Sequence, residues 1–212
     1  MRIVIRLSLY LVSVAAFAAP VGAQQPVASP PGASAGVAGD PDGKIEWPSP
    51  DGRFACLTSY REDLHSIDLI DRKSGKKLQR IGEEDSDRTY WHLLWAPDSK
   101  RFALMTRLGH PIQGVDVYVR SGEVFQKVEL PELPAADIPE KLKHGKKFPH
   151  VASLNWQEAR EWKDGSLVVS IDTMIDGAGS SITATRTVVV GFDRTGKARI
   201  VTSTIKYETE TD

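Results

Sequence analysis

The sequence predicts an all-β fold made of about three antiparallel, blade-like sheets. Three observations predict it. A motif of tryptophan, tight turn and apolar strand recurs along the chain; two pairs of corresponding residues have the same spacing; and apolar residues alternate after each turn. From Asp51 to Asp98 is 47 positions, and from Gly75 to Gly122 is also 47. Because two separate landmarks share one period, we interpret the copies as a structural repeat.

The composition is that of a globular chain. Of the 212 residues 41% are hydrophobic, and 27 basic against 28 acidic residues leave a net charge of −1. This apolar content excludes a disordered chain, and the lack of positive charge argues against a nucleic-acid partner. The single cysteine, Cys56, excludes an internal disulfide framework and a cysteine-clustered metal site, and we expect no cofactor. Cys56 lies in an apolar run and is predicted to be a small buried residue.

Residues 1–23 have the three parts of a secretory signal peptide. Arg2 and Arg6 give a positive start, an apolar run of 13 residues extends from Leu7 to Ala19, and small residues follow. The alternative, a membrane anchor, needs about 20 apolar residues. No later segment approaches that length, so we do not expect an integral membrane protein. The sequence therefore predicts a cleaved signal and a periplasmic or secreted protein.

Residues 24–44 are rich in Pro, Gly, Ala and Ser and contain no aromatic residue, which predicts a disordered linker. A folded domain at 45–212 is expected to follow. Its copies are expected near residues 45–82, 90–130 and 152–204, with an insertion at 131–150. The third copy carries about eight more residues between its two turns, and we place them within 174–183.

Each of the first two copies begins with a turn. At residues 49–52 and 96–99 a proline fixes one backbone angle, the aspartate after it bonds its own backbone, and glycine or serine tolerates the tight position. Alternation follows the turn, with Phe54 and Cys56 on one face of a strand and Ala55 on the other. Each copy has room for four short strands in about 40 to 45 residues, the length of a propeller blade. We therefore expect antiparallel, propeller-like blades.

Residues 49–55 read Ser-Pro-Asp-Gly-Arg-Phe-Ala, and residues 67–69 read Ile-Asp-Leu. These segments resemble the repeats of TolB-type and dipeptidyl-peptidase-IV-type β-propellers, in which a Trp-Ser-Pro-Asp-Gly-Lys turn precedes strands that end in Ile-Tyr or Ile-Asp. The resemblance covers residues 45–130 well and 154–203 loosely. It implies a periplasmic protein-binding module or a non-catalytic domain of a peptidase.

The chain departs from that family in its number of blades. A closed propeller needs about four to eight blades, and three occupy this sequence. We expect the sheets to be open, to be divided differently, or to be completed by oligomerisation. Open sheets have exposed edges, so self-association or strand addition by a partner is expected there.

The most aromatic segment, residues 90–95, contains one candidate site. Trp91 and Trp95 share the strand face that is expected to be core. Tyr90 and His92 take the other face, where they line a groove or pack between blades.

The insertion at 131–150 contains the second candidate site. Its four prolines predict irregular backbone, with a helical turn or two over 137–143 that Asp137 caps. The segment is locally basic through Lys141, Lys143, His144, Lys146 and Lys147. One interpretation is a site for an anionic partner, namely a polysaccharide, a lipid head group or an acidic protein face; the other is a solvated loop.

These patterns predict a secreted or periplasmic binding module without enzymatic activity. Its partner would be an envelope or extracellular protein, or an anionic ligand. The alternatives are an extracellular hydrolase or lyase acting on sugars or peptides, and an accessory subunit that only stabilises a complex. The sequence has no G-x-S-x-G elbow and no phosphate-binding glycine loop. An enzyme would be indicated by two carboxylates about 5–10 Å apart in a cleft, and a module by an exposed edge strand.

Overall fold

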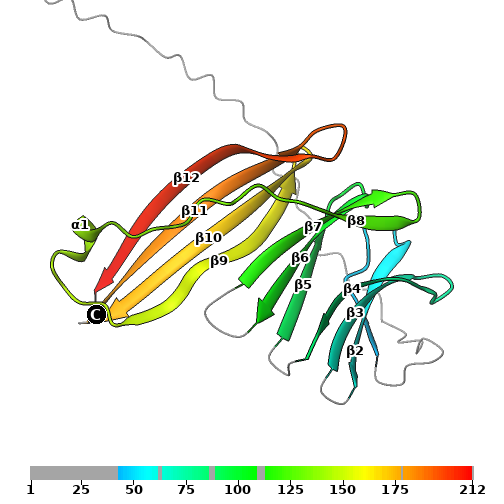
Figure 1. Cartoon of the computed structure of the whole chain (residues 1–212), viewed down its shortest axis with the longest axis horizontal. Coiled ribbons are helices and arrows are strands. Elements are labelled where there is room, and N and C mark those ends of the chain that lie inside the picture. The colour runs from blue at the N-terminus through cyan, green and yellow to red at the C-terminus, as the bar shows by residue number, and fades with distance from the viewer. Residues whose placement is uncertain (1–42, 62–63, 86–88, 109–112, 178, 212) are drawn as a thin grey trace, which may run out of the picture. The chain divides into compact units, whose positions relative to one another are not determined.

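The computed structural model describes residues 43–61, 64–85, 89–108, 113–177 and 179–211. These residues form three four-stranded antiparallel sheets, here called A, B and C, in one compact unit. In each sheet the strands are neighbours in chain order, and no sheet closes into a barrel. Figure 1 shows the three sheets following one another along the chain.

Sheet A consists of β1 (Lys44–Glu46), β2 (Phe54–Arg61), β3 (Leu64–Asp71) and β4 (Lys77–Glu84). Sheet B consists of β5 (Thr89–Trp95), β6 (Arg101–Leu108), β7 (Gln113–Ser121) and β8 (Val124–Val128). Sheet C consists of β9 (His150–Lys163), β10 (Ser166–Gly177), β11 (Ser180–Phe192) and β12 (Ala198–Thr211). A short helix, α1 (Glu140–Lys143), precedes sheet C.

The all-β prediction is confirmed, and each expected copy overlaps one sheet. The first boundary differs, because Lys44, which we placed in the linker, begins β1 and pairs with Thr58. The last also differs, because β12 continues to Thr211, beyond the expected end at 204. The expected signal peptide and nearly all of the expected linker lie outside the described residues.

The turns at the start of the first two copies have the geometry that their residues predict. The amide of Ser49 donates to the carbonyl of Phe54 at 2.8 Å, and the amide of Ala96 donates to the carbonyl of Arg101 at 2.8 Å. At the tight position Gly52 has φ 70° and Ser99 has φ 55°, both left-handed. The hydroxyl of Ser99 accepts a hydrogen bond from the amide of Asp51 at 3.0 Å, which joins the turn of sheet B to that of sheet A.

The extra residues of the third copy lengthen two strands. β10 and β11 have 12 and 13 residues and pair as a hairpin from Leu167 with Val190 to Gly177 with Ser180. The tip packs closely on the insertion, because a Cβ at Gly177 would lie 2.5 Å from Cδ of Pro149.

Two apolar clusters join neighbouring sheets. Between sheets A and B lies an aromatic cluster whose rings stack or meet edge-on: Phe54, Trp95, Phe102, Tyr118 and Phe125. Between sheets B and C the cluster is aliphatic, with Val115 and Val117 packed with Leu167, Val169 and Val188. The alternation predicted for β2 is confirmed, because Phe54 and Cys56 face sheet B and Ala55 lies on the opposite face.

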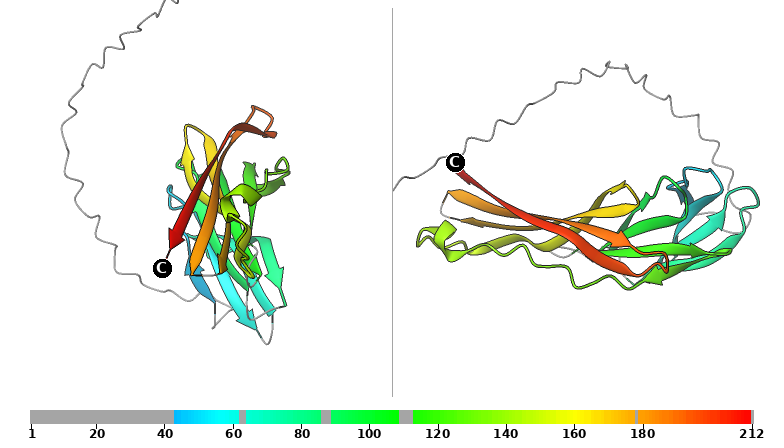
Figure 2. Two further views of the ribbon diagram at one scale, coloured as in Figure 1. Left: turned by 90° about the vertical axis from the view of Figure 1, so that its left-hand side faces the viewer. Right: turned by 90° about the horizontal axis from the view of Figure 1, so that it is seen from above.

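The insertion runs along sheet C as an extended segment before α1 (Figures 1 and 2). Ala136 is fully buried there, and its amide donates to Oδ1 of Asn155 at 2.9 Å. The predicted cap was wrong: α1 begins at Glu140 after Pro139, with no side-chain capping bond, so Asp137 does not cap it. Within the described ranges, no helix is both long enough and apolar enough to cross a bilayer.

Candidate functional site

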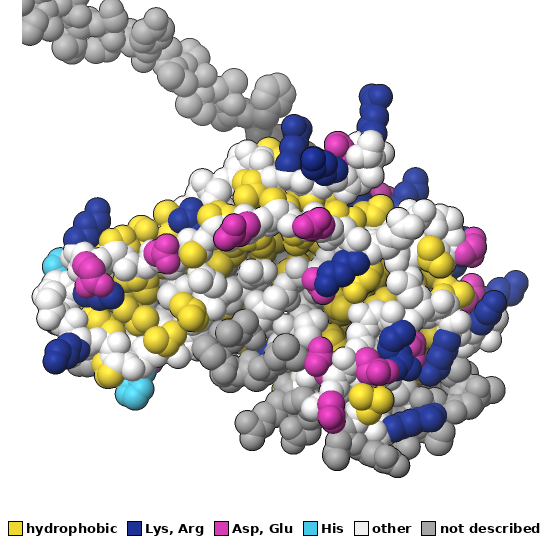
Figure 3. All heavy atoms as spheres, viewed as in Figure 1, with side chains coloured by type: hydrophobic (Ala, Val, Ile, Leu, Met, Phe, Trp, Pro, Cys, Tyr) yellow, Lys and Arg dark blue, Asp and Glu magenta, His cyan; other side chains and the backbone are white. Residues whose placement is uncertain are grey.

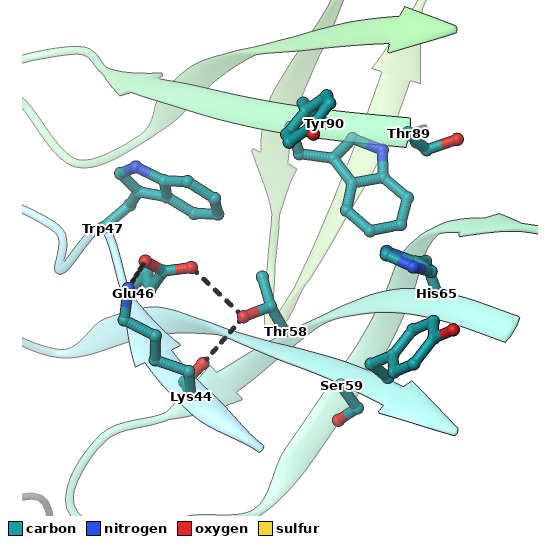
Figure 4. Close-up of a pocket in the computed structure, with 10 residues that line it drawn as sticks. Lys44, Glu46, Trp47, Thr58, Ser59, His65, Thr89 and Tyr90 are labelled. Carbon is teal, nitrogen blue, oxygen red and sulfur yellow. Dashed lines mark hydrogen bonds and ion pairs between the residues drawn. The ribbon is translucent and has the colours of Figure 1, made fainter. Parts of the chain in front are cut away.

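An open pocket of about 390 Å³ lies where β1 and β5, the first strands of sheets A and B, come close (Figure 4). Its volume falls in the range of small-molecule sites, about 300–1,000 Å³. Ten residues from β1, β2, β3, β5 and the turn after β1 line it: Lys44, Glu46, Trp47, Thr58, Ser59, Tyr60, His65, Thr89, Tyr90 and Trp91. Half of these side chains are aromatic rings, counting the His65 imidazole.

Trp47 forms one wall with an unusual backbone. Its φ of 46° is left-handed, which is rare for a bulky residue and is held only where the surroundings enforce it. The indole nitrogen of Trp95 donates to the carbonyl of Trp47 at 2.8 Å and so holds this peptide in place. The ring of Trp47 meets His92 edge-on, with centroids 6.1 Å apart. Trp47 and Trp95, its counterpart in the repeat, both pack against the cluster between sheets A and B, but of the two only Trp47 lines the pocket.

A row of three rings forms the opposite wall. The ring centroids of Tyr60 and His65 lie 4.3 Å apart, and those of His65 and Trp91 lie 6.4 Å apart. Tyr60 and His65 face each other across the β2–β3 pair, whereas Trp91 comes from β5 in the next sheet. The wall therefore forms only when sheets A and B are packed together.

The one carboxylate in the lining is already partnered. Glu46 forms an ion pair with Lys44 on the same strand. The hydroxyl of Thr58 lies 3.1 Å from Oε2 of Glu46 and 3.2 Å from the carbonyl oxygen of Lys44, as the dashed lines in Figure 4 show. With Lys44 and Glu46 as its charged lining residues, the pocket is formally neutral.

Two polar atoms in the lining have no hydrogen-bond partner within the described part of the chain: Nε2 of His65 and Oγ1 of Thr89. Thr89 is only 3% exposed. A buried hydroxyl without a partner costs about 1–3 kcal/mol. Both residues line the pocket, but these two atoms have almost no accessible surface, so a molecule bound in the pocket as it stands does not reach them.

The structure places the sequence-predicted candidates in two separate locations. Tyr90 lines the pocket and is 63% exposed, and His92 contacts the wall residue Trp47. The basic residues of the insertion lie on and just after α1, next to the β10–β11 hairpin, and none of them lines the pocket.

The basic segment has mixed charge. Lys143 is held by an ion pair with Glu140 at 2.5 Å, whereas Lys141, His144, Lys146 and Lys147 are exposed. Figure 3 shows basic, acidic and histidine side chains together at this end of the molecule. Because acidic groups are interspersed, the geometry does not favour this segment over the pocket as a binding site.

Sequence reasoning missed four pocket residues that carry its chemistry: Trp47, Tyr60, His65 and Thr89. The left-handed backbone of Trp47 has no sequence signal beyond the proline that follows it. The sequence did contain a signal for Thr89. It occupies the same strand face as Trp91 and Leu93, which point to the core, and it places a hydroxyl there.

Groups suited to covalent or metal chemistry are not gathered here. Cys56 is fully buried, and burial, followed by the nearby charges of Glu46 and Asp68, raises the pKa of its thiol. Among the residues that the structure describes, no three histidine, cysteine, aspartate or glutamate side chains are placed to hold a metal ion.

No model of a known protein family matches this chain, and no curated protein matches it significantly.

Proposed function

We propose that the protein is a secreted or periplasmic binding module without enzymatic activity, and that its pocket takes a neutral, polyhydroxylated ring such as a sugar. The observation that carries the proposal is the set of aromatic rings that walls a formally neutral pocket, namely Trp47, Tyr60, His65, Tyr90 and Trp91. Aromatic faces offer apolar contact to the flat side of such a ring.

The charge of the pocket supports an uncharged ligand. Lys44 neutralises Glu46, so neither a cation nor an anion finds an unpaired opposite charge among the described lining residues. The carboxylate arrangement supports binding over hydrolysis. Glycoside hydrolysis uses two carboxyl groups about 5–9.5 Å apart, and Glu46 is the one acidic residue of the described lining.

We also propose that sheets A, B and C are successive blades of the TolB-type repeat that the sequence resembles. Support comes from the shared strand order and from a repeated joint between sheets. The indole nitrogen of Trp95 bonds the carbonyl of Trp47, and that of Trp162 bonds the carbonyl of Leu94 at 3.0 Å. Each tryptophan thus anchors its own sheet to the sheet before it.

The array is open rather than completed by a fourth sheet on sheet C. The face of sheet C opposite its apolar cluster is mostly polar, as the strand register assigns it. It carries Asp172, Thr183, Thr185, Thr187, Thr202 and Thr204, together with the half-buried Val168, Met174 and Val189. A polar outer face is typical of the last unit of a repeat protein, which must remain soluble.

The test is calorimetric titration of the protein with cellobiose, maltose and chitobiose at millimolar concentration. We expect at least one disaccharide to bind. Two pocket variants should weaken that binding: Tyr60→Ala and Tyr90→Ala, each of which removes an exposed ring that lines the pocket. Each should raise Kd about tenfold, because a stacked ring contributes about 1–3 kcal/mol.

Val124→Ala on β8 is the matched control, since Val124 is 46% exposed and Tyr60 is 47% exposed. Its Kd should equal that of the unmodified protein. The absence of binding to all three sugars would overturn the proposed ligand class. Equal losses in the control and pocket variants would overturn the proposed site.

A further inference from the structure

The edge of sheet C offers a surface that is independent of the pocket. β12 has 14 residues and is the outermost strand of the sheet in chain order, drawn red in Figure 1. All of its residues are exposed except Ala198, which is buried, and Ile205, which is half-buried. A long exposed edge strand presents unpaired amide and carbonyl groups to other strands.

The two edges of sheet C differ in regularity. β9, the opposite edge, has three register shifts against β10 and a left-handed Asn155 with φ 49°. β12 has one shift, near its start, and then pairs without interruption from Thr202 to Thr211. Bulges and kinks protect an edge from pairing, so β9 is protected and most of β12 is not.

The charges of β12 lie on one face. Lys206, Glu208 and Glu210 pair with Thr185, Thr183 and Ser181 of β11, and so share the polar face of sheet C. Ile205, which precedes Lys206, and Tyr207, which follows it, lie on the opposite face, and Tyr207 is 39% exposed. The strand thus carries a basic and an acidic residue two positions apart on the same face.

We propose that a second copy of the chain pairs with this edge, β12 against β12 in antiparallel register centred on Tyr207. In this register Lys206 lies opposite Glu208 of the partner subunit, and the symmetry of the pair repeats that contact. Tyr207 lies opposite the partner subunit's Tyr207. Opposite charges and aromatic pairs directly across antiparallel strands are stabilising. The two four-stranded sheets then form one sheet of eight strands.

The charge pattern selects this register over its neighbours. A register centred on Lys206 sets lysine against lysine with no unlike pair. One centred on Glu208 pairs Lys206 with Glu210 twice but sets glutamate against glutamate at the axis. Like charges directly opposite one another are unfavourable. A register centred on Ile205 places Lys206 opposite Thr204 and Glu208 opposite Thr202, with no charge pair. Of these four registers, only the one centred on Tyr207 pairs unlike charges twice without setting like charges opposite one another.

Sedimentation velocity over a concentration series tests the proposal on the unmodified protein and on variants in which the charges at positions 206 and 208 are exchanged. The unmodified protein should show a monomer–dimer equilibrium. Lys206→Glu alone and Glu208→Lys alone each place like charges opposite one another twice, and each should raise the dimer Kd at least about tenfold. The double variant with both changes exchanges the charges and should restore the original Kd.

Glu210→Lys is the register control, because Glu210 lies opposite Thr204 of the partner subunit in the proposed pairing. Its dimer Kd should change by less than about threefold. A Tyr207→Cys variant should form a disulfide-linked dimer on oxidation, since the position meets itself at the symmetry axis and the native Cys56 is buried. Circular dichroism of each variant checks that the fold is retained.

Three results would overturn the proposal. The first is a monomeric unmodified protein across the concentration series. The second is a double variant no tighter than the single variants. The third is a Glu210→Lys variant weakened as much as the single variants, which would indicate general charge repulsion.

Discussion

The indole nitrogen of Trp95 lies 2.8 Å from the carbonyl oxygen of Trp47 and donates a hydrogen bond to it. The two residues are counterparts in consecutive copies of the repeat, and the bond crosses from sheet B to sheet A. It ties the aromatic cluster, where Trp95 packs, to the pocket wall formed by Trp47. Packing between the sheets and the shape of the pocket are therefore coupled through one peptide group.

Trp95→Phe should destabilise the protein by about 1–2 kcal/mol, because it removes the donor and leaves the Trp47 carbonyl without that bond while keeping most of the ring packing. Urea unfolding followed by circular dichroism measures the change. Trp162→Phe, which removes the equivalent bond to Leu94, should cost a similar amount. A loss below about 0.3 kcal/mol in both variants would show that these bonds add little to stability.

Thr89→Val should leave the free protein equally stable or raise its free energy of unfolding by up to about 1 kcal/mol. The Thr89 hydroxyl is buried without a partner among the described residues, so replacing it with a methyl group removes a desolvation cost. The measurement is urea unfolding without added sugar. Thr173→Val, whose hydroxyl accepts a 3.1 Å hydrogen bond from the amide of Asn155, is the control and should be destabilised. Destabilisation of both variants alike would mean that the Thr89 hydroxyl is satisfied in solution.

Gly82→Ala should destabilise the protein by about 1–3 kcal/mol through overpacking. A Cβ at this position would lie 2.8 Å from Cγ2 of Ile67 and 3.2 Å from Nε1 of the pocket residue Trp91. Gly114→Ala is the matched control on β7, since a Cβ there meets nothing within 4 Å. Thermal unfolding of both variants gives the comparison, and equal Tm values would contradict the close packing of β4 against Trp91.

Two turn aspartates should make stability fall in acid. Bonds from the Ser74 hydroxyl and amide lower the pKa of Asp71, and bonds from the Thr195 hydroxyl and amide lower the pKa of Asp193, both from 3.8. A lowered pKa means that the folded protein binds the proton less readily than the unfolded chain does. The resulting stabilisation is present above about pH 4 and is lost as the pH falls through the folded pKa values.

The double variant Asp71→Asn with Asp193→Asn keeps an oxygen acceptor in both turns but does not titrate. Its Tm should therefore fall less between pH 5 and pH 2.5 than that of the unmodified protein. Differential scanning calorimetry at intervals across this range makes the comparison. Parallel curves for the two proteins would show that these turns do not contribute to acid sensitivity.

The sequence was informative wherever a local residue pattern fixes the backbone. Pro-Asp followed by a small residue predicts the turns before β2 and β6, and alternation assigns the two faces of β2. The pocket was only half predicted. Tyr90 and His92 follow from alternation along one strand, but the meeting of Tyr60 and His65 with Trp91 depends on how two sheets pack. No periodicity within one copy encodes that approach.

The two tryptophan bonds between sheets also carry a direction. In each, the carbonyl acceptor belongs to the earlier sheet and the indole donor to the later one. When the chain leaves a ribosome or a membrane channel with its N-terminus first, every acceptor emerges before its donor. The bond that ties sheet B to sheet A can therefore form only after residue 95 has emerged, and the bond that ties sheet C to sheet B only after residue 162.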